Sequence, residues 1–559
     1  MPQPIANNTT GNPISGSIER SSISLAIEGQ GRDYGNNYSG LNWYSSITPL
    51  EGKYVIISKS VGSGDLTHWI TADNTDAELL YTVNRLPSVA NQQTFTTTAS
   101  ALDYLVQNDY LVLDYMPSNT DADNMVINLE SSVLTSYPQT GTNWEDLTTN
   151  GINGTLNNGP IFNLNNRTIE TDGVDDYISL PYYELTGSTT LEIGFKSPSN
   201  LGPEQSLVNF RNNSSNYNGY GATVNFTSTN PNTIGFRFVL NSVPYYNTGW
   251  TITPNTNYLL QAVVDWDAGQ IGHLKLNLLD TNSGGSGRVT DQHTLMARNS
   301  TSYFFQGNLY HYKVYGRGLS LSELEQNYYG GPIVTDGLSV MVDAGNFVSY
   351  EYATSTTYSL TGSYTGSVIN GVSFEQSNGG IWSFDGIDDN INFGTNSVYD
   401  VTGPFTIDLW FYGGNGAGSF GGLWNKDGGG NFGNWGLYGD PGNDYIRFGY
   451  RATSGTQVEC SNPAYSDLST PGWYHYCGTY DGSTLRLYRN GTQIASAAVS
   501  STHQTPSNNS YDAAIGYRDG SSAYYLNFKV GIAKLYNSRA LSVEEVRQNY
   551  TAHRQKYLL

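Results

Sequence analysis

Charged residues are scarce in this chain of 559 residues, and those present are mostly acidic. They make up only 13% of the sequence, and 48 Asp and Glu residues against 26 Lys and Arg residues give a formal net charge of -22 at pH 7. A strongly negative chain repels phosphate backbones and anionic lipid surfaces. We therefore expect no nucleic acid and no membrane surface among its partners.

Long apolar segments and cysteines are also lacking. No stretch approaches the roughly 18 apolar residues of a membrane helix, so no membrane insertion is expected. Residues 1–20 lack the basic start and apolar run of a secretory signal. The two cysteines, Cys460 and Cys477, are too few for a disulfide framework. We expect free, buried thiols, with a disulfide between the two as the alternative.

What the chain does contain is glycine and tyrosine, with 63 and 44 residues respectively. This mixture is typical of many short strands joined by tight turns, and it indicates an all-β protein. At roughly 100 to 200 residues per domain, the length predicts three or four domains.

An internal repeat defines the domain organisation. Thr171–Leu180 (TDGVDDYISL) resembles Phe384–Phe393 (FDGIDDNINF), and Leu319–Tyr328 (LSLSELEQNY) resembles Leu541–Tyr550 (LSVEEVRQNY). Two homologous domains at residues 124–330 and 331–559 follow, preceded by a separate domain at residues 1–123.

Period-two alternation predicts strands within both repeats, for example at Thr233–Leu240 and Tyr445–Tyr450. The pattern favours a sandwich or barrel that ends in a short helix, because Ser320 with Glu323 and Ser542 with Glu545 form S-x-x-E capping boxes. The N-terminal domain is predicted to be mostly β. Its predicted elements are strands at Tyr54–Ser58 and Leu79–Val83 and a short helix at Ala101–Val106.

Several longer motifs resemble a known domain family. Met125–Asn158 and Ile333–Tyr350 resemble the opening of LamG-like, concanavalin A-type jelly rolls, and Trp473–Gly491 resembles the family's W-x-H strand and the hairpin that follows it. The DGxDD turns resemble the family's F-D-G-x-D-D, with Thr171 in place of Phe in the first copy. The resemblance covers about three quarters of the chain and implies two tandem jelly rolls; it says much less about function.

The combination of these domains with an unrelated N-terminal domain is most similar to virion structural proteins of tailed bacteriophages, especially those of marine cyanobacteria. That resemblance implies a non-enzymatic protein of a tail fibre, baseplate or head surface. It would be made in the host cytoplasm and released by lysis in the virion, with other virion proteins and host-surface polysaccharide as partners. By analogy with phage appendages, it would be a homo-oligomer. The alternative is a carbohydrate-active enzyme or a secreted bacterial adhesin.

The two DGxDD turns suggest calcium sites, because carboxylates are ligands that Ca²⁺ prefers. The alternative is structural, since Asp and Gly also suit a tight turn between strands. The candidate ligands are Asp172, Asp175 and Asp176 in the first copy and Asp385, Asp388 and Asp389 in the second.

Glycoside hydrolysis is the enzyme class to consider for this type of fold. It requires two carboxylates about 5 Å apart in retaining enzymes. The candidate strands provide only one each, Glu192 in LEIGF and Asp408 in IDLWF. We therefore expect no enzyme activity and assign no catalytic residue. His475, beside Trp473, is interpreted as a packed core residue.

A glycan site is predicted in the second repeat, in the loop DGGGNFG at residues 427–433. Asp427 and Phe432 lie within the loop and Trp424 and Trp435 flank it. Aromatic rings stack on the apolar faces of sugars, and carboxylates accept hydrogen bonds from their hydroxyls. For the two tryptophans the alternative is that they are inward-facing strand residues.

Overall fold

The computed structural model describes residues 67–73, 80–86, 93–95 and 125–557, the last range with gaps at 184, 203, 212–218, 225–231, 241–242, 269, 278, 281–293, 299–301, 353, 376, 415–420, 428–432, 441–443, 508–509 and 519–523. By its internal contacts the chain divides into two compact units. One comprises residues 1–123, 488–493 and 541–559, and the other residues 124–487 and 494–540.

The first unit contains a small antiparallel sheet in its described part, with the order β1 (Thr67–Asp73), β2 (Leu80–Leu86) and β3 (Gln93–Phe95). The predicted strand at Leu79–Val83 corresponds to β2. The other two N-terminal predictions, Tyr54–Ser58 and Ala101–Val106, lie outside the described residues. The same unit holds α4 (Val543–Arg554) and η4 (Gln555–Tyr557).

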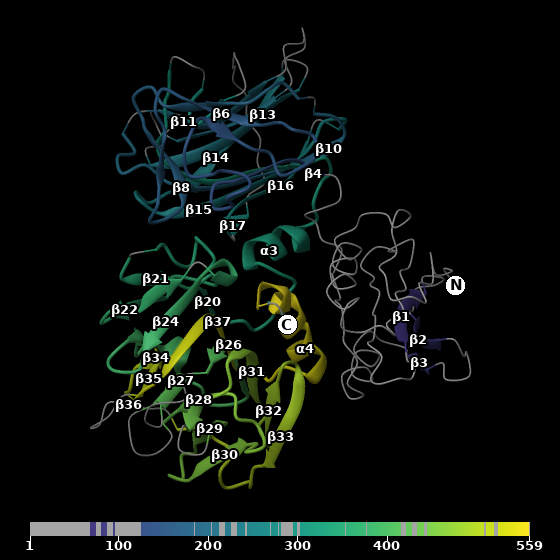
Figure 1. Ribbon diagram of the computed structural model, residues 1–559, viewed down its shortest axis with the longest axis vertical. Helices are drawn as coiled ribbons and strands as arrows, with labels where there is room; N and C mark the ends of the chain where they lie inside the picture. Colours follow the sequence, from purple (N-terminus) through teal and green to yellow (C-terminus); the bar gives the residue numbers. More distant parts are fainter. Residues whose placement is uncertain are drawn as a thin grey trace. The chain divides into compact units, whose positions relative to one another are not determined.

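The second unit contains the first repeat and most of the second, and each repeat folds as a sandwich of two eight-stranded sheets (Figure 1). The first sheet of the first jelly roll has the order β17 (Leu279–Asp280), β16 (Gln270–Leu276), β15 (Asn257–Asp265), β10 (Ser188–Lys196), β19 (Gln306–Tyr315), β8 (Thr168–Asp172) and β7 (Ile161–Asn163), with β4 (Met125–Glu130) also paired to β19. Its second sheet has the order β14 (Val243–Thr251), β13 (Thr233–Leu240), β12 (Gly219–Val224), β11 (Gln205–Arg211), β18 (Thr294–Leu295), β9 (Tyr177–Ser179), β6 (Gly154–Asn157) and β5 (Asn143–Trp144).

The second jelly roll repeats this topology strand for strand. Its first sheet has the order β33 (Thr492–Ala498), β32 (Thr484–Arg489), β31 (Gly472–Tyr480), β26 (Phe405–Gly413), β37 (Asn527–Asn537), β24 (Ile381–Asp385) and β23 (Ser373–Glu375), with β20 (Val340–Asp343) paired to β37. Its second sheet has the order β30 (Gln457–Ser461), β29 (Tyr445–Arg451), β28 (Trp435–Asp440), β27 (Gly421–Lys426), β34 (Ala513–Ile515), β25 (Asn390–Gly394), β22 (Thr365–Ile369) and β21 (Thr356–Tyr358). A ribbon of β35 (Tyr517–Arg518) and β36 (Tyr524–Tyr525) and the short helices η2 (Ser377–Gly379) and η3 (Ser397–Tyr399) complete it. The predicted all-β fold of two tandem jelly rolls is confirmed.

Alternation along the strands places one face of each sheet in the core. In β26, Ile407, Leu409 and Phe411 are fully buried in the core cluster, so Asp408 and Trp410 between them point to the opposite face of the sheet. Cys460 belongs to the same core, whereas Cys477 pairs with Asp408 across β26 and β31. The two cysteines are free and buried, as expected.

The predicted helices are present at the ends of both repeats. In α3 (Leu321–Tyr329), Ser320 and Glu323 form the complete capping box, and Gly330 ends the helix in the left-handed conformation at φ 72°. Ser542 and Glu545 exchange the same two hydrogen bonds at the start of α4. In the first jelly roll α3 packs on the outer face of the sheet, where Gln261 donates to the Leu324 carbonyl.

A loop of the second jelly roll contacts the first. The Phe347 ring stacks on Tyr310 at 4.3 Å between ring centroids, and Lys196 pairs with Glu351 at 2.7 Å. Gly194 allows this approach, because a Cβ at that position would come within 2.8 Å of the Phe347 ring and of His311. The two jelly rolls are thus joined by side-chain contacts as well as by the short segment between them.

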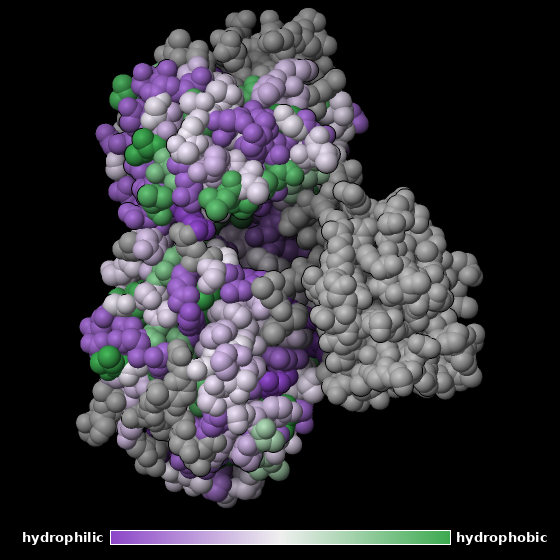
Figure 2. Space-filling model, viewed as in Figure 1, coloured by the Kyte–Doolittle hydropathy of each residue, from purple (hydrophilic) through white to green (hydrophobic). Residues whose placement is uncertain are grey.

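On the face drawn in Figure 2, the coloured apolar residues form small patches set among polar ones. Exposed large apolar side chains in the described part include Val174 and Ile387, which occupy the same position in the two DGxDD turns. Among the described helices, none has the length and apolar character needed to cross a membrane.

Candidate functional site

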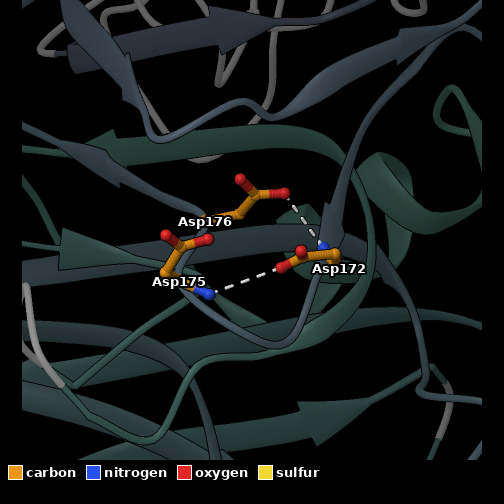
Figure 3. Close-up of side chains that lie close together, drawn as sticks. All are labelled: Asp172, Asp175 and Asp176. Carbon is orange, nitrogen blue, oxygen red and sulfur yellow. Dashed lines mark hydrogen bonds between the residues drawn. The ribbon is translucent and has the colours of Figure 1, made fainter.

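The DGVDD turn of the first jelly roll joins β8 to β9 and brings three carboxylates together. One oxygen from each of Asp172, Asp175 and Asp176 lies within 4.8 Å of the others. The Asp172 Oδ1 atom accepts hydrogen bonds from the Val174 and Asp175 amides, and the Asp176 Oδ2 atom accepts one from the Asp172 amide at 3.1 Å (Figure 3). These bonds are those of an Asx-type turn.

The DGIDD turn of the second jelly roll has the same geometry. Asp385 accepts from the Ile387 and Asp388 amides, and Asp389 accepts from the Asp385 amide at 3.0 Å. Burial raises the pKa of Asp389, and the charges of Asp385 and Asp388 raise it further, against the lowering effect of the backbone hydrogen bond. The same causes raise the pKa of Asp176.

Both clusters supply carboxylates that suit calcium, but each brings together one oxygen from each of three side chains, half or fewer of the six to eight oxygen ligands that Ca²⁺ takes. Several of these oxygens already hold the turn together. The structural interpretation therefore accounts for the residue types without an ion. The calcium interpretation stays a prediction that can be tested in the same way at both turns.

A polar pocket lies beside the DGVDD turn of the first jelly roll. Its volume is about 490 Å³, and its lining includes Asp172 and Asp176 together with Glu170 of β8 and Asn308 of β19. Asn308 pairs with Glu170 in the register of these two strands. The repeat motif identified the turn, but no local pattern indicated that Glu170 and Asn308 would share a pocket with it.

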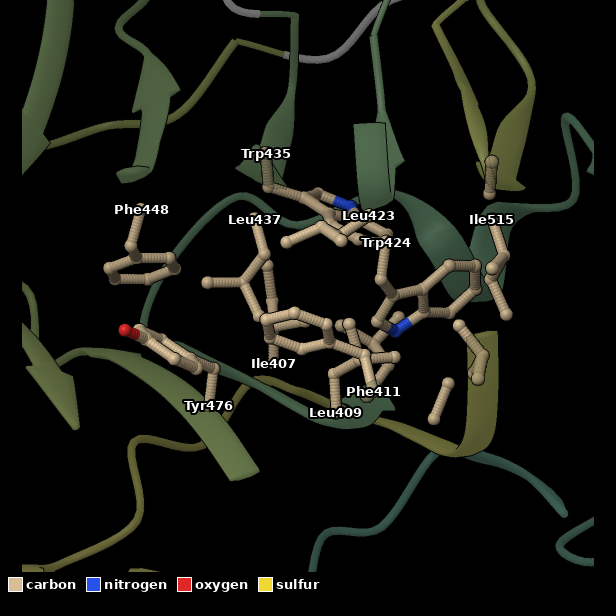
Figure 4. Packing of buried hydrophobic residues seen from close by; sticks show 14 of the residues in the cluster. Ile407, Leu409, Phe411, Leu423, Trp424, Trp435, Leu437, Phe448, Tyr476 and Ile515 are labelled. Atoms are coloured by element: carbon tan, nitrogen blue, oxygen red, sulfur yellow. The ribbon is translucent and has the colours of Figure 1, made fainter. Parts of the chain in front are cut away.

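The two tryptophans proposed for the glycan site lie in the core of the second jelly roll. Trp424 and Trp435 are fully buried, and their rings meet edge to face at 5.1 Å. Figure 4 shows them pointing toward Ile407, Leu409 and Phe411 of the facing sheet. Their indole nitrogens donate to backbone carbonyls of Lys534 and Tyr399. This is the inward-facing alternative, and it removes both rings from the set of surface residues able to stack on a sugar.

Asp427 is also buried, although it stands at the start of the predicted binding loop. Its side chain has no exposed surface, and its Oδ2 atom accepts from Arg518 Nε at 2.6 Å. The Arg518 guanidinium also lies over the Tyr438 ring at 5.0 Å. Asp427 is thus paired with Arg518 and does not present its carboxylate to solvent. Phe432 lies outside the described residues.

The lone strand carboxylates Glu192 and Asp408 occupy equivalent positions in β10 and β26. Asp408 is fully buried between Lys534 Nζ, at 2.8 Å, and His475 Nε2, at 3.0 Å. Burial acts to raise its pKa, but these two partners outweigh that effect and hold the pKa well below its usual range. His475 is therefore packed and buried, as predicted, but on the face of the sheet opposite the core cluster, with a charged partner that the sequence did not indicate.

Glu192 has a comparable setting with different partners. Gln261 and Asn327 donate to its Oε2 atom at 2.9 and 3.0 Å, and His311 Nε2 lies 3.4 Å from Oε1. Burial acts to raise its pKa, but the interactions with His311, Lys313 and Gln261 lower it to about 2. A carboxyl group with this pKa is ionised at neutral pH and is a poor proton donor for glycoside cleavage.

Comparison with known proteins characterises the second jelly roll. Residues 385–547 match the family described as the concanavalin A-like lectin/glucanases superfamily. The match runs from the DGIDD turn into α4, so this region is a concanavalin A-like domain, and the first jelly roll has the same strand order. No curated protein matches the chain.

Several solved structures are similar to parts of the chain. The binding domain of Paraclostridial Mosquitocidal Protein 1 is 17% identical over 38% of this chain and 52% of that chain, with a TM-score of 0.31. Domains LG4-5 of the mouse laminin alpha1 chain are 10% identical over 69% and 92%, with a TM-score of 0.25. Domain 4 of AbnA, a GH43 extracellular arabinanase from Geobacillus stearothermophilus solved with arabinotriose, is 14% identical over 38% and 98%, with a TM-score of 0.27. The chain thus spans about half the length of the first of these structures.

Proposed function

We propose that this chain is a non-enzymatic, carbohydrate-binding structural protein of a phage virion. The matched superfamily contains both lectins and glucanases, so its fold alone allows binding or catalysis. The observation that favours binding is the burial and ionisation of the two strand carboxylates. Glu192 and Asp408 are buried, and their pKa values are lowered by permanent partners. Neither is placed to exchange a proton with a substrate in solvent.

Binding and catalysis are separated by one pair of measurements. The intact chain is applied to a glycan array, and each glycan that binds is then incubated with the chain and assayed for new reducing ends. The proposal expects binding without cleavage. Release of reducing ends that disappears in a Glu192→Gln or Asp408→Asn variant, while that variant stays folded by circular dichroism, would replace it with the glucanase alternative.

The virion assignment is supported by the resemblance of the sequence to structural proteins of tailed phages. In that setting the partners are other virion proteins and host-surface polysaccharide, and the protein leaves the cell by lysis. Mass spectrometry of purified virions is expected to detect the chain together with tail or capsid proteins. Its recovery from the medium of uninfected cells, with none in virions, would favour the secreted adhesin.

The predicted loop at residues 427–433 is best tested through Phe432. An Asp427→Asn change would disturb the buried pair with Arg518, so loss of binding in that variant would not separate recognition from folding. Phe432→Ala changes neither member of that pair. If the loop recognises the glycan, this variant is expected to lose attachment to host cells while its unfolding transition stays unchanged. Unaltered attachment would remove the loop from the proposal.

A further inference from the structure

The pocket beside the DGVDD turn is lined almost entirely by hydrogen-bonding groups. Its described lining comprises three carboxylates, four side-chain amides and three hydroxyl side chains, with two glycines and Ile161 as the apolar remainder. Its volume of about 490 Å³ falls in the range of roughly 300 to 1,000 Å³ that is usual for small-molecule pockets. The lining has no cationic side chain and no aromatic ring.

Two side chains in this lining are more than nine-tenths buried, and each has one oxygen that accepts no hydrogen bond from the part of the chain that the structure describes. Asp176 is 5% exposed, and it uses only Oδ2, toward the Asp172 amide. Asn308 is 7% exposed and donates through Nδ2 to Thr168 Oγ1 at 2.8 Å. The Asp176 Oδ1 and Asn308 Oδ1 atoms accept no hydrogen bond from other described residues. Neither oxygen is among the enclosed side-chain atoms without a partner, so both are accessible, and both residues line the pocket, where a ligand donor can reach them.

Comparison with the second jelly roll shows which of these pocket residues are part of the DGxDD turn itself and which are not. Its turn is the same, but the strand pair equivalent to Glu170 and Asn308 is Ser383 and Lys529. Lys529 is engaged by Glu375 at 2.7 Å. The Asp389 Oδ1 atom, equivalent to Asp176 Oδ1, also has no partner but is completely enclosed. The Asp oxygen without a partner is therefore common to both turns, whereas Glu170 and Asn308 are specific to the first jelly roll.

We propose that this pocket is a subsite for a single neutral sugar residue of a glycan, an inference that rests on the carbohydrate-binding function proposed above. Carboxylate and amide oxygens accept hydrogen bonds from neighbouring sugar hydroxyls, and amide N–H groups donate hydrogen bonds to them. Three carboxylates without a cationic side chain repel uronic acids, sialic acids and sulfated sugars. Because the lining offers no aromatic ring for a sugar to stack on, we expect the subsite to hold one sugar residue through hydrogen bonds. Ile161 would be the apolar contact of that sugar.

The test uses the intact chain and two variants that keep the turn bonds. In Asp172→Asn the amide oxygen can still accept from the Val174 and Asp175 amides, and Glu170→Gln removes a charge from the pocket wall without changing its size. Asp385→Asn is the matched control, because it makes the same change in the equivalent turn of the second jelly roll. Neutral glycans selected on the array are titrated by calorimetry, with glucuronic acid and sialic acid as anionic probes.

The expected result is a rise in Kd of about tenfold or more for each pocket variant, which corresponds to loss of one charge-assisted hydrogen bond. Asp385→Asn should leave Kd unchanged, and the anionic sugars should not bind. If glycans bind and both pocket variants keep the wild-type Kd, or if anionic sugars bind best, the subsite is refuted while the carbohydrate-binding function stands. If the chain binds no glycan at all, the proposed function fails and the subsite with it.

Discussion

Glu192 and Asp408 are buried carboxylates in one sheet of each jelly roll, and each is held by permanent side-chain partners. Asp408 serves both Lys534 and His475, and all three side chains are fully buried. Asp408→Ala leaves a buried ammonium group without its carboxylate, so we expect a loss of roughly 3 to 5 kcal/mol in the free energy of unfolding. Urea denaturation of the intact chain measures this.

The control for this change is Arg486→Gln, which removes an ion pair whose two side chains are about one-third exposed. An exposed pair of this kind contributes at most about 1 kcal/mol. Equal effects in the two variants would contradict the role assigned to Asp408.

The lowered pKa of Glu192 leads us to expect that stability depends on pH in the acid range. Its pKa is about 2 in the folded chain and 4.5 in its ordinary setting, so the folded state favours the ionised form. The stabilisation is complete above pH 4.5 and is lost as the pH falls toward about 2; at full strength it amounts to about 3 kcal/mol. The difference in unfolding free energy between the wild type and Glu192→Gln should therefore shrink across this window. A difference that stays constant from pH 7 to pH 2.5 would show that the charge of Glu192 does not stabilise the fold.

At the scale of elements, the two DGxDD turns are built by their own hydrogen bonds. Because the Asp172 and Asp385 carboxylates already accept backbone amides, we expect millimolar calcium to leave the melting temperature unchanged. Differential scanning calorimetry with calcium and with EGTA checks this. A rise with calcium that is lost in both Asp175→Asn and Asp388→Asn would instead establish the metal interpretation.

The capping box of α3 gives a second prediction at this scale. Ser320 accepts from the Glu323 amide, and Glu323 accepts from the Ser320 amide at 2.7 Å. Ser320→Ala should lower the free energy of unfolding by about 1 kcal/mol, because a helix amide loses its acceptor. Ser542→Ala makes the same change in α4, and chemical denaturation of both variants should give losses of similar size. No change in either variant would contradict the capping role.

At the scale of the whole molecule, the loop that carries Phe347 couples the two jelly rolls. We expect Phe347→Ala to speed proteolytic cleavage between residues 330 and 337, because the variant loses the ring contact with Tyr310. Leu134→Ala is a matched control, since Leu134 occupies the equivalent position in the first jelly roll and is 62% exposed. Equal cleavage rates for wild type and both variants would show that this contact does not hold the junction.

The features predicted correctly from the sequence are those that depend on local pattern. Alternation identified strands such as β13 and β29, and the S-x-x-E spacing located the starts of both helices. The duplicated motifs indicated two jelly rolls, because equivalent local patterns fold into equivalent strands. Conformational preferences over a few residues are enough for such predictions.

Which charged side chains pair with one another could be seen only in the tertiary structure. Asp427 meets Arg518, 91 residues later, and Asp408 meets Lys534, 126 residues later. The pocket likewise joins the DGVDD turn to Asn308 through the register of β8 and β19. The sequence by itself determined which segments become strands and which face of each is apolar. Only the pairing of distant strands decided which charges meet, which aromatic rings enter the core and where a polar pocket stays open.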